Sequence, residues 1–361
     1  MEPTKLEHFR QQLLAWHATC HRPMPWKGEK NPYLIWLSEV ILQQTRVEQG
    51  LPYFEKFKWA YPKIENLANA PEDEVMKLWQ GLGYYSRARN MHTTAKFIAN
   101  ELKGIFPHTY EGIRALKGVG PYTAAAIASF AYDLPYAVVD GNVFRVLARF
   151  LGIDIPTDST AGKKLFHELA QQALDTTQPG KYNQAIMDFG ATQCTPQQPN
   201  CTECPLKQDC YAFQHNLADK LPVKTKSIVK KERFFHYLVI QYKEQVLLQK
   251  RTAKDIWQNL YEFPLIEATQ LLEVEQLKQT PIWKELNPLD NFTITRLSKP
   301  FRQVLTHQVI CAVFYEIECP QLLAAEHSKY LNANFKNLSK FAFPKIIDWY
   351  LQDNSLYLSL M

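Results

Sequence analysis

Long apolar runs are missing from this 361-residue sequence. No stretch approaches the roughly 18 consecutive apolar residues of a membrane-spanning helix, so we expect no membrane segment. The N-terminal residues lack a basic start followed by an apolar core, and we therefore expect no secretion signal. Internal repeats and low-complexity tracts are also lacking. A composition of 46% hydrophobic and 21% charged residues then indicates a soluble globular protein with room for two or more domains.

Excess charge of either sign is scarce as well. Residues 1–220 hold 23 Lys and Arg against 22 Asp and Glu, and residues 234–361 hold 13 against 13. Most of the net charge of +5 lies in residues 221–233, which hold five basic residues and one acidic residue. A short basic segment between two neutral blocks predicts an interdomain linker. Two roles fit this linker: a solvated tether, or a segment that lies along a phosphate backbone.

Cysteines are few, and four of the seven are clustered. Without a secretion signal, a disulfide framework is not expected. Cys194, Cys201, Cys204 and Cys210 fall within seventeen residues, which predicts a metal site. A zinc ribbon usually contributes two Cys-x-x-Cys pairs, and only one is present. Four thiolates also bind iron–sulfur clusters, so the spacing leaves zinc and iron–sulfur as the alternatives.

Residues 33–45 are almost wholly apolar apart from Ser38, Glu39 and a pair of glutamines. Such a helix is buried nearly all round. Burial disfavours the charged form of a carboxyl group, so the pKa of Glu39 should be raised. A carboxylic acid that stays protonated near neutral pH is what general acid catalysis requires. The structural alternative is an ion pair between Glu39 and an arginine.

Gly118 and Gly120 bracket a tight turn just before a helix-forming stretch, residues 122–128. A glycine-rich turn that opens a helix presents free backbone N–H groups to a phosphate. Asp140 stands immediately before a second helical stretch, where an N-cap carboxylate belongs. The N–H donors and the helix dipole should keep Asp140 ionised, so that its pKa and that of Glu39 shift in opposite directions, as a stabilising carboxylate and an acid require. An ordinary helical hairpin with a capping aspartate is the plainer interpretation.

Two further segments are distinctive. Residues 78–90 contain a second glycine-bracketed turn in which aromatic and basic residues interleave, as suits contact with an opened duplex; a helix packing corner is the alternative. Beyond residue 233 the pattern becomes strand-like, because residues 234–240 and 245–249 are rich in β-formers and are separated by a turn.

Together, residues 116–126 and Asp140 resemble the helix-hairpin-helix and catalytic aspartate of the endonuclease III superfamily of DNA glycosylases. The run Ser-Glu-Val-Ile-Leu-Gln-Gln-Thr, residues 38–45, resembles the active-site helix of the MutY adenine DNA glycosylases. The cysteine spacing is similar to the 4Fe–4S loop of this superfamily. Residues 257–264 resemble the entry to a Nudix-type domain, although residues 267–286 lack the acidic metal-binding helix of a Nudix hydrolase.

The resemblance implies a multidomain fold: an all-α helix-hairpin-helix DNA glycosylase with an iron–sulfur cluster loop, followed by an α+β Nudix-like domain. The expected boundaries are 1–220 for the glycosylase domain, 221–233 for the basic linker and 234–361 for a Nudix-like 8-oxoguanine recognition domain. Within the first domain, a six-helix barrel would span roughly 27–135, and a cluster subdomain would combine 1–26 with 136–220.

The same resemblance implies a role for each matching residue. Glu39 is the acid and Asp140 the carboxylate that stabilises the sugar cation, with Tyr122 and Asn142 in support. The other implied positions are the adenine pocket (Arg22, Trp26 and Gln184), the wedge around the estranged base (Leu42, Gln44 and Tyr84), the lesion contacts (Thr306 and His307), the DNA backbone contacts (Gly118 and Gly120) and the ligands of a 4Fe–4S cluster (Cys194, Cys201, Cys204 and Cys210).

The implied activity is base-excision repair, in which adenine opposite 8-oxoguanine or guanine is flipped out of double-stranded DNA and removed by hydrolysis. A monomeric, bacterial, nucleoid-associated enzyme of the cytoplasm is expected, with no membrane partner. Strand-cleaving relatives form a Schiff base through a lysine, but Tyr122 stands at that position, so we predict a monofunctional glycosylase. The alternative from another class is a non-catalytic iron–sulfur DNA-binding or redox protein, and the presence of both carboxylates argues against it.

One motif departs from the family. Leu305-Thr306-His307 stands where these proteins usually have Phe-Ser-His, whose serine reaches the 8-oxoguanine. Thr306 keeps the hydroxyl group, whereas Leu305 loses the aromatic face. A polar turn before a strand at 309–317 is the alternative.

Overall fold

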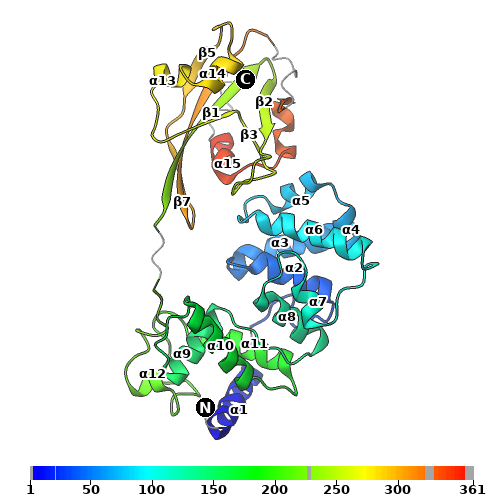
Figure 1. Cartoon of the computed structure of the whole chain (residues 1–361), viewed down its shortest axis with the longest axis vertical. Helices are drawn as coiled ribbons and strands as arrows, with labels where there is room; N and C mark the ends of the chain where they lie inside the picture. The colour runs from blue at the N-terminus through cyan, green and yellow to red at the C-terminus, as the bar shows by residue number, and fades with distance from the viewer. Residues whose placement is uncertain (1–2, 21, 226–228, 322–328, 354–361) are drawn as a thin grey trace. The chain divides into compact units, whose positions relative to one another are not determined.

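The structure, a computed structural model, describes residues 3–20, 22–225, 229–321 and 329–353. The chain folds into two compact units (Figure 1). The helical unit comprises residues 1–69 and 90–226, and the sheet unit comprises residues 70–89 and 227–361. None of the helices in the described ranges is both long and apolar enough to cross a membrane.

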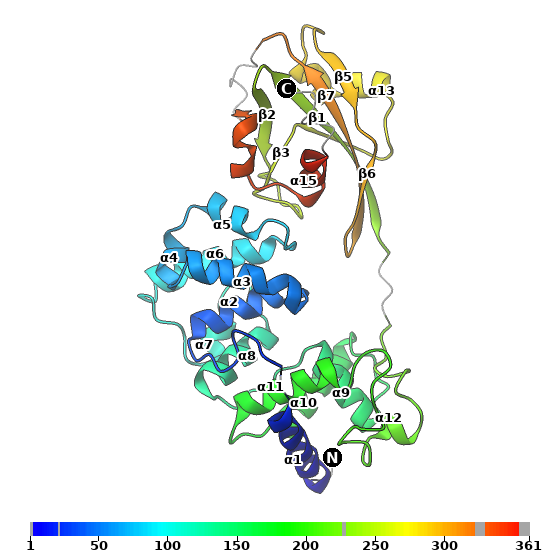
Figure 2. The same ribbon diagram turned by 180° about the vertical axis from the view of Figure 1, so that it is seen from behind.

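The helical unit consists of α-helices joined by short loops. Its first helix, α1 (Pro3–Thr19), packs against the late helices α10 and α11 rather than against the next helix in sequence, as both views show (Figures 1 and 2). The other helices of this unit are α2 (Pro32–Leu42), α3 (Val47–Ala60), α4 (Ile64–Asn69), most of α6 (Ser86–Asn100), α7 (Tyr110–Arg114), α8 (Pro121–Tyr132), α9 (Gly141–Leu151), α10 (Thr160–Ala173), α11 (Pro179–Thr192) and α12 (Tyr211–Gln214).

One apolar core joins α1 to the second half of the helical unit. Leu6, Phe9 and Leu13 follow the helical period and are buried in the core that α9, α10 and α11 also form. Arg10 adds two hydrogen bonds to carbonyl groups at the end of α10, from Nε (2.9 Å) and from Nη2 (2.6 Å). Since full burial of a large apolar side chain stabilises by roughly 1.5–3 kcal/mol, these contacts hold α1 firmly in place.

The sheet unit contains a mixed β-sheet with the strand order β3-β2-β1-β7-β5, in which β4 also pairs with β1, β6 with β7 and β8 with β2. The central strands β1 and β7 are parallel, with Lys231 opposite Gln308, while the other pairs are antiparallel. The bounds are β1 (Lys231–Tyr242), β2 (Gln245–Lys250), β3 (Tyr261–Glu262), β4 (Leu265–Ala268), β5 (Thr293–Leu297), β6 (Phe301–Val304), β7 (Gln308–Glu318) and β8 (Tyr330–Asn334).

Helices cover both faces of this sheet. Alternate residues of β1 and β7 point to opposite sides and pack against the helices there. Leu238 and Tyr315 join a core with Trp283. On the other face Phe314 stacks on Tyr350, with ring centroids 3.9 Å apart. These helices are α13 (Val274–Lys278) and α14 (Pro281–Leu286) on the first face and α15 (Lys345–Gln352) on the second. The 3-10 helix η1 (Phe335–Lys340) follows β8 in the chain and contacts it.

Helix α5 (Glu72–Trp79) and the turn after it belong to the sheet unit. Lys250 Nζ (2.5 Å) and the Tyr261 hydroxyl (2.8 Å) both bind the carboxylate of Asp73. Residues 70–89 therefore pack with the C-terminal strands, although the sequence places them among the helices. The domain boundaries expected from the sequence remain a prediction.

Candidate active site

Helix α2, which carries Glu39, is capped and almost fully buried. Asn31 accepts a hydrogen bond from the backbone N–H of Tyr33 (3.0 Å), and Pro32 occupies the first helical position, where a missing N–H is harmless. Every residue from Tyr33 to Ile41 is buried, and Glu39 is only 7% exposed. The apolar run therefore places a carboxyl group inside the protein, as the sequence predicts.

The surroundings of Glu39 favour its protonated form. Burial raises the pKa of Glu39 to about 7; a hydrogen bond from Tyr122 opposes the rise and the charge of Asp140 adds to it. The predicted upward shift is confirmed. Among the arginine ion pairs of the described residues, none involves Glu39, so the structural alternative finds no support.

Gly118 and Gly120 are glycines for different reasons. Gly118 has a φ of +81°, and a Cβ there would lie 2.8 Å from the Cβ of Asn90, so both backbone and space exclude a side chain. Gly120 caps α8 with a φ of −84°, and a Cβ there would meet nothing within 4 Å. An open backbone at a helix N-terminus suits the close approach of a phosphate, and contact of Gly118 and Gly120 with DNA stays a prediction.

Asp140 is the N-cap of α9, as predicted. Its Oδ1 accepts from the backbone N–H groups of Asn142 (2.9 Å) and Val143 (2.8 Å), and its Oδ2 accepts from Asn142 Nδ2 (2.8 Å). The expected downward shift is wrong: burial raises the pKa of Asp140, because it outweighs these hydrogen bonds and the charge of Arg145. The two carboxyl groups still differ, since three hydrogen bonds oppose the effect of burial at Asp140 and one opposes it at Glu39.

Tyr122 of α8 links the two carboxyl groups. Its hydroxyl donates to the sulfur of Met187 on α11 at 3.6 Å and lies within hydrogen-bonding reach of the Glu39 carboxyl group. Burial, together with the charges of Glu39 and Asp140, raises the pKa of Tyr122 well above its ordinary value, so Tyr122 is a neutral donor at physiological pH. Side chains from α2, α8 and the start of α9 therefore meet at one place.

Sequence reasoning missed Arg145, which connects this place to the cysteine loop. Its Nη2 donates to Asn142 Oδ1 (2.8 Å) and to the Gly190 carbonyl (2.5 Å), and its Nε donates to the Cys194 carbonyl (2.7 Å). Because Asn142 in turn donates to Asp140, a hydrogen-bonded chain runs from the carboxylate to Cys194. The available signal was an arginine three residues after Asn142 on a helix whose residues are mostly apolar.

The three residues predicted for the adenine pocket lie on two segments. Trp26 packs edge-on against Phe54 of α3, with ring centroids 5.4 Å apart. Arg22 forms an ion pair with Asp188 of α11 at 2.8 Å. Gln184 lies one turn before Asp188 on the same helix and is partly exposed. Arg22 therefore contacts the helix that carries Gln184. The contact of either residue with a base stays a prediction.

Two of the three wedge residues have an unusual backbone. Gln44, just after α2, has a φ of +54°, and Tyr84 has a φ of +48°. For a residue other than glycine, this left-handed backbone conformation costs of order 1–3 kcal/mol. Such residues concentrate at functional sites. Nothing in the sequence signalled this strain. Leu42 is the last residue of α2, two positions before Gln44, and its role in DNA stays a prediction.

Within the sheet unit, Tyr84 meets the predicted lesion reader. Its hydroxyl shares a hydrogen bond with Thr306 Oγ1, in the turn between β6 and β7. The guanidinium of Arg87 lies 5.5 Å from the Tyr84 ring centroid, within cation–π range. Thr306 and His307 are both exposed, and the His307 carbonyl accepts from the backbone N–H of Lys231 (3.0 Å). Tyr84, predicted to wedge into the duplex, and Thr306, predicted to contact the lesion, are therefore neighbours.

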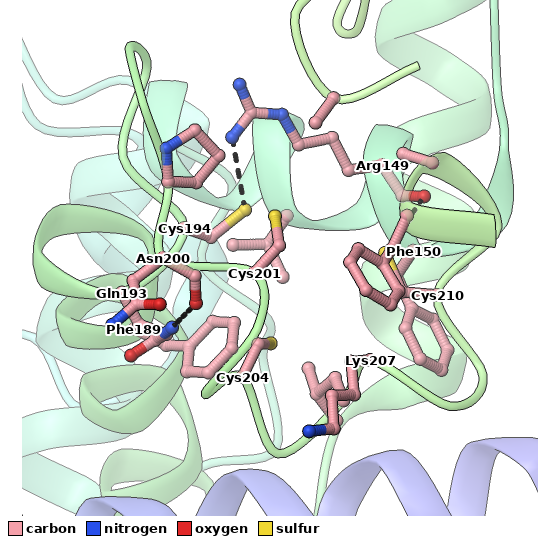
Figure 3. Close-up of a pocket in the computed structure, with 16 residues that line it drawn as sticks. Arg149, Phe150, Phe189, Gln193, Cys194, Asn200, Cys201, Cys204, Lys207 and Cys210 are labelled. Atoms are coloured by element: carbon pink, nitrogen blue, oxygen red, sulfur yellow. Dashed lines mark hydrogen bonds between the residues drawn. The ribbon is translucent and has the colours of Figure 1, made fainter. Parts of the chain in front are cut away.

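The four clustered cysteines line one pocket, shown in Figure 3, with about 440 Å³ of empty space including its open mouth. Arg149 Nη1 donates to Cys194 Sγ at 3.4 Å. Burial raises the pKa of the Cys204 thiol to about 12, so its thiolate form requires nearby positive charge. Apolar side chains complete the wall, among them Val146, Phe150, Phe189 and Leu206.

The four thiols of the cysteine pocket are a donor set that fits an iron–sulfur cluster. Around one zinc ion with Zn–S distances of about 2.3 Å, tetrahedral sulfurs lie about 3.8 Å apart. In the part of the chain that the structure describes, no group of three or more His, Cys, Asp or Glu side chains converges to hold a single metal ion. Four cysteines spread around one largely apolar pocket match the ligand set of an iron–sulfur cluster.

The chain matches two domain families. Residues 37–171 match the HhH-GPD superfamily base excision DNA repair protein, and residues 236–353 match the NUDIX domain. A solved thermostable thymine-DNA glycosylase is similar with a TM-score of 0.55 and 28% identity, over 59% of this chain and 98% of that one. A non-covalent endonuclease III–DNA complex shares the fold at a TM-score of 0.52 and 19% identity, over 60% and 99%. Fold and site together define a helix-hairpin-helix DNA glycosylase of base-excision repair, with a Nudix-like domain after it.

Curated relatives narrow this class. The adenine DNA glycosylase of Buchnera aphidicola subsp. Baizongia pistaciae is 38% identical over 292 residues, which are 79% of this chain and 81% of that protein. The adenine DNA glycosylase of Mus musculus is 44% identical over 215 residues, which are 57% of this chain and 42% of that protein. The chain belongs to the family of adenine-specific DNA N-glycosylases. The predicted fold class, a helical glycosylase followed by an α+β Nudix-like domain, is confirmed apart from its cluster.

Proposed function

We propose that this chain removes adenine mispaired with 8-oxoguanine or guanine from double-stranded DNA, as a monomer at the nucleoid, by hydrolysis and without cutting the strand. The observation that carries the proposal is the Glu39 carboxyl group, buried in α2 with a pKa of about 7 beside Tyr122 and Asp140. A buried acid next to a hydrogen-bonded carboxylate is the arrangement that glycosidic bond hydrolysis requires.

The chemistry divides between the two carboxyl groups. Glu39 gives its proton to the adenine ring, and the bond between the base and the sugar C1′ breaks with its electron pair passing to the base. The sugar is left as an oxocarbenium-like cation, which the negative charge of Asp140 stabilises. A water molecule then adds to C1′, and its proton returns to Glu39. The product is an abasic site, and both side chains end as they began.

The monofunctional outcome rests on Tyr122. A strand-cleaving glycosylase attacks C1′ with a lysine amine and forms a Schiff base. Tyr122 has a pKa raised well above its ordinary value and lies within hydrogen-bonding reach of Glu39, so it is a poor nucleophile and a good positioning group. We therefore assign cleavage of the base–sugar bond to water.

Recognition of 8-oxoguanine is assigned to the turn that carries Thr306 and His307. Both side chains are exposed, and Thr306 offers a hydroxyl that both donates and accepts. Its hydrogen bond to Tyr84 links the lesion contact to the residue proposed to wedge into the duplex.

A 4Fe–4S cluster is assigned to the cysteine pocket. Cys194, Cys201, Cys204 and Cys210 would hold it, with Arg149 donating to Cys194. When bound, the cluster supplies a cross-link that fixes the loop 194–210. Through Arg145, the same loop supports Asn142 and thereby the orientation of Asp140.

Single-turnover excision tests the proposed function. Purified protein is incubated with duplexes that differ only in the base opposite adenine: 8-oxoguanine, guanine or thymine. Adenine should be released from the first two, and the strands should break only after alkali. Glu39→Gln serves as the matched control, because it removes the acid and almost no volume. Release from the adenine–thymine duplex at an equal rate would contradict the proposed specificity.

A further inference from the structure

Asp188, on α11, is a buried carboxylate with three basic neighbours. Its side chain is 0% exposed; Oδ1 accepts from Arg22 Nη1 (2.8 Å), and Oδ2 accepts from Lys27 Nζ (2.7 Å) and faces His17 Nε2 (3.3 Å). Burial alone would raise the pKa of Asp188, but the hydrogen bonds from His17, Lys27 and Arg22 lower it below its usual range. Asp188 is therefore ionised throughout the physiological range.

The same helix forms a wall of the candidate active site. Met187, the residue before Asp188, contacts the Tyr122 hydroxyl through its sulfur at 3.6 Å. Gly190 packs so closely on Asn142 that a Cβ at 190 would lie 2.6 Å from the Asn142 Cβ. Asp188 thus lies between Met187, which contacts Tyr122, and Gly190, which contacts Asn142.

Ion pairs tie the segment between α1 and α2 to this wall. Asp188 holds Arg22 and Lys27, and between these two residues Trp26 packs on Phe54 of α3. Two prolines precede the tryptophan and stiffen the segment. Because Trp26 lies between two anchors that share one carboxylate, the position of its ring depends on that carboxylate.

We propose that Asp188 is a positioning residue for the base pocket: by holding Arg22 and Lys27, it keeps Trp26 in place for the base that is excised. The inference rests on the proposed function, because Trp26 is placed in the adenine pocket by the resemblance to enzymes that excise adenine. Asp188 does not touch the base and acts through the segment it holds. An amide at this position would leave Arg22 and Lys27 close together without a counter-charge, so the segment would move.

The test compares Asp188→Asn with Asp133→Asn in the full chain. Asp133 also pairs with a lysine of this segment, Lys30, at 2.8 Å, but both of these side chains are 59% exposed. Single-turnover excision from an adenine–8-oxoguanine duplex should fall roughly 10- to 100-fold in Asp188→Asn, the scale expected for a misplacement of about 1 Å, and should be unchanged in Asp133→Asn. The dissociation constant for the duplex should change by no more than about threefold in either variant.

A second measurement separates positioning from folding and from bond cleavage. In a Glu39→Gln background, a duplex with 2-aminopurine in place of the target adenine reports the surroundings of the flipped base through its fluorescence. Asp188→Asn should change this fluorescence, because the Trp26 ring no longer occupies the same place. Adding Lys27→Met to Asp188→Asn removes an unpaired charge, so the melting temperature should recover while excision stays slow.

Two results would overturn the inference. One is wild-type excision in Asp188→Asn with unchanged 2-aminopurine fluorescence. The other is recovery of excision together with the melting temperature in the double variant, which would reduce Asp188 to a purely structural role. If the wild-type protein excises no adenine, the proposed function fails, and the fluorescence comparison still decides the role of Asp188.

Discussion

Replacing Glu39 with glutamine should stabilise the protein while it abolishes excision. In the folded chain this carboxyl group has a pKa of about 7, against an ordinary value of 4.5. At about 1.4 kcal/mol per pH unit, that difference makes the folded chain about 3 kcal/mol less stable at neutral and alkaline pH than it would be without the buried acid. Glutamine has nearly the same volume and no charge, so it removes this penalty.

The gain in stability depends on pH, because the folded and unfolded chains bind the Glu39 proton with different affinity. Below about pH 4.5 the carboxyl group is protonated in both folded and unfolded chains, so Glu39 imposes no penalty. Between pH 4.5 and about 7 the unfolded chain loses the proton while the folded chain keeps it, and wild-type stability falls as pH rises. The melting temperature of Glu39→Gln should therefore exceed that of the wild type only slightly at pH 5, and by roughly 6–12 °C at pH 8 for a unit of this size.

Calorimetry at pH 5 and pH 8 measures the stability, and single-turnover excision between pH 5 and pH 9 measures the chemistry. Wild-type excision should decline above about pH 7, where the acid loses its proton. The variant should be slower by roughly 10²–10⁴-fold below pH 7, and the difference should shrink at higher pH. An equal gain in melting temperature at both pH values would refute the buried-acid reasoning. A wild-type rate that stays constant up to pH 9 would refute the role of Glu39 as the proton donor.

Four further outcomes are expected. Asp140→Asn should slow excision by roughly 10²–10³-fold, because an amide cannot stabilise the sugar cation, and a covalent complex trapped from wild-type protein with borohydride would contradict hydrolysis by water. Tyr122→Phe removes the hydrogen bond that lowers the pKa of Glu39, so the alkaline decline of the excision rate should move to higher pH; a decline at unchanged pH would show that the contact is not made. Thr306→Ala should weaken the binding preference for 8-oxoguanine over guanine opposite adenine by about 0.5–1.5 kcal/mol, and equal weakening on both duplexes would assign Thr306 to general docking. Cys201→Ser should lower the iron content and the visible absorbance of the purified protein, whereas stoichiometric zinc without iron in the wild type would exclude the cluster.

Features that depend on neighbouring residues in the sequence could be predicted. The apolar run of α2 implied a buried Glu39 with a raised pKa, and the position of Asp140 before a helix implied an N-cap; both are found. The direction of the Asp140 pKa was wrong, because the sequence shows its hydrogen-bond donors but not how deeply the carboxylate is buried. A local sequence pattern therefore predicts which groups form hydrogen bonds to a carboxylate. It does not predict whether these hydrogen bonds or burial decide the pKa of that carboxylate.

Features that depend on distant residues could not be predicted. Asp188 meets Arg22 across 166 positions, and Tyr84 meets Thr306 across 222. Each pair consists of residue types that are common at protein surfaces, so neither carries a local signature. The left-handed backbone of Gln44 was equally invisible, because glutamine has no preference for that region. Such strain is imposed by the surrounding fold and not by the residue itself.

The packing of α1 has a consequence for biosynthesis. Its apolar stripe of Leu6, Phe9 and Leu13 is covered by a core to which α11 contributes, and α11 ends at Thr192. At ribosomal rates of about 5–20 residues per second, roughly 10–35 s separate the synthesis of α1 from that of α11. During this interval the nascent chain presents an uncovered apolar stripe next to the ribosome, where holding chaperones bind such surfaces. The contacts of α1 with this core are therefore completed only after α11 has been made, and a message that pauses translation before codon 192 would lengthen the time in which the nascent chain can aggregate.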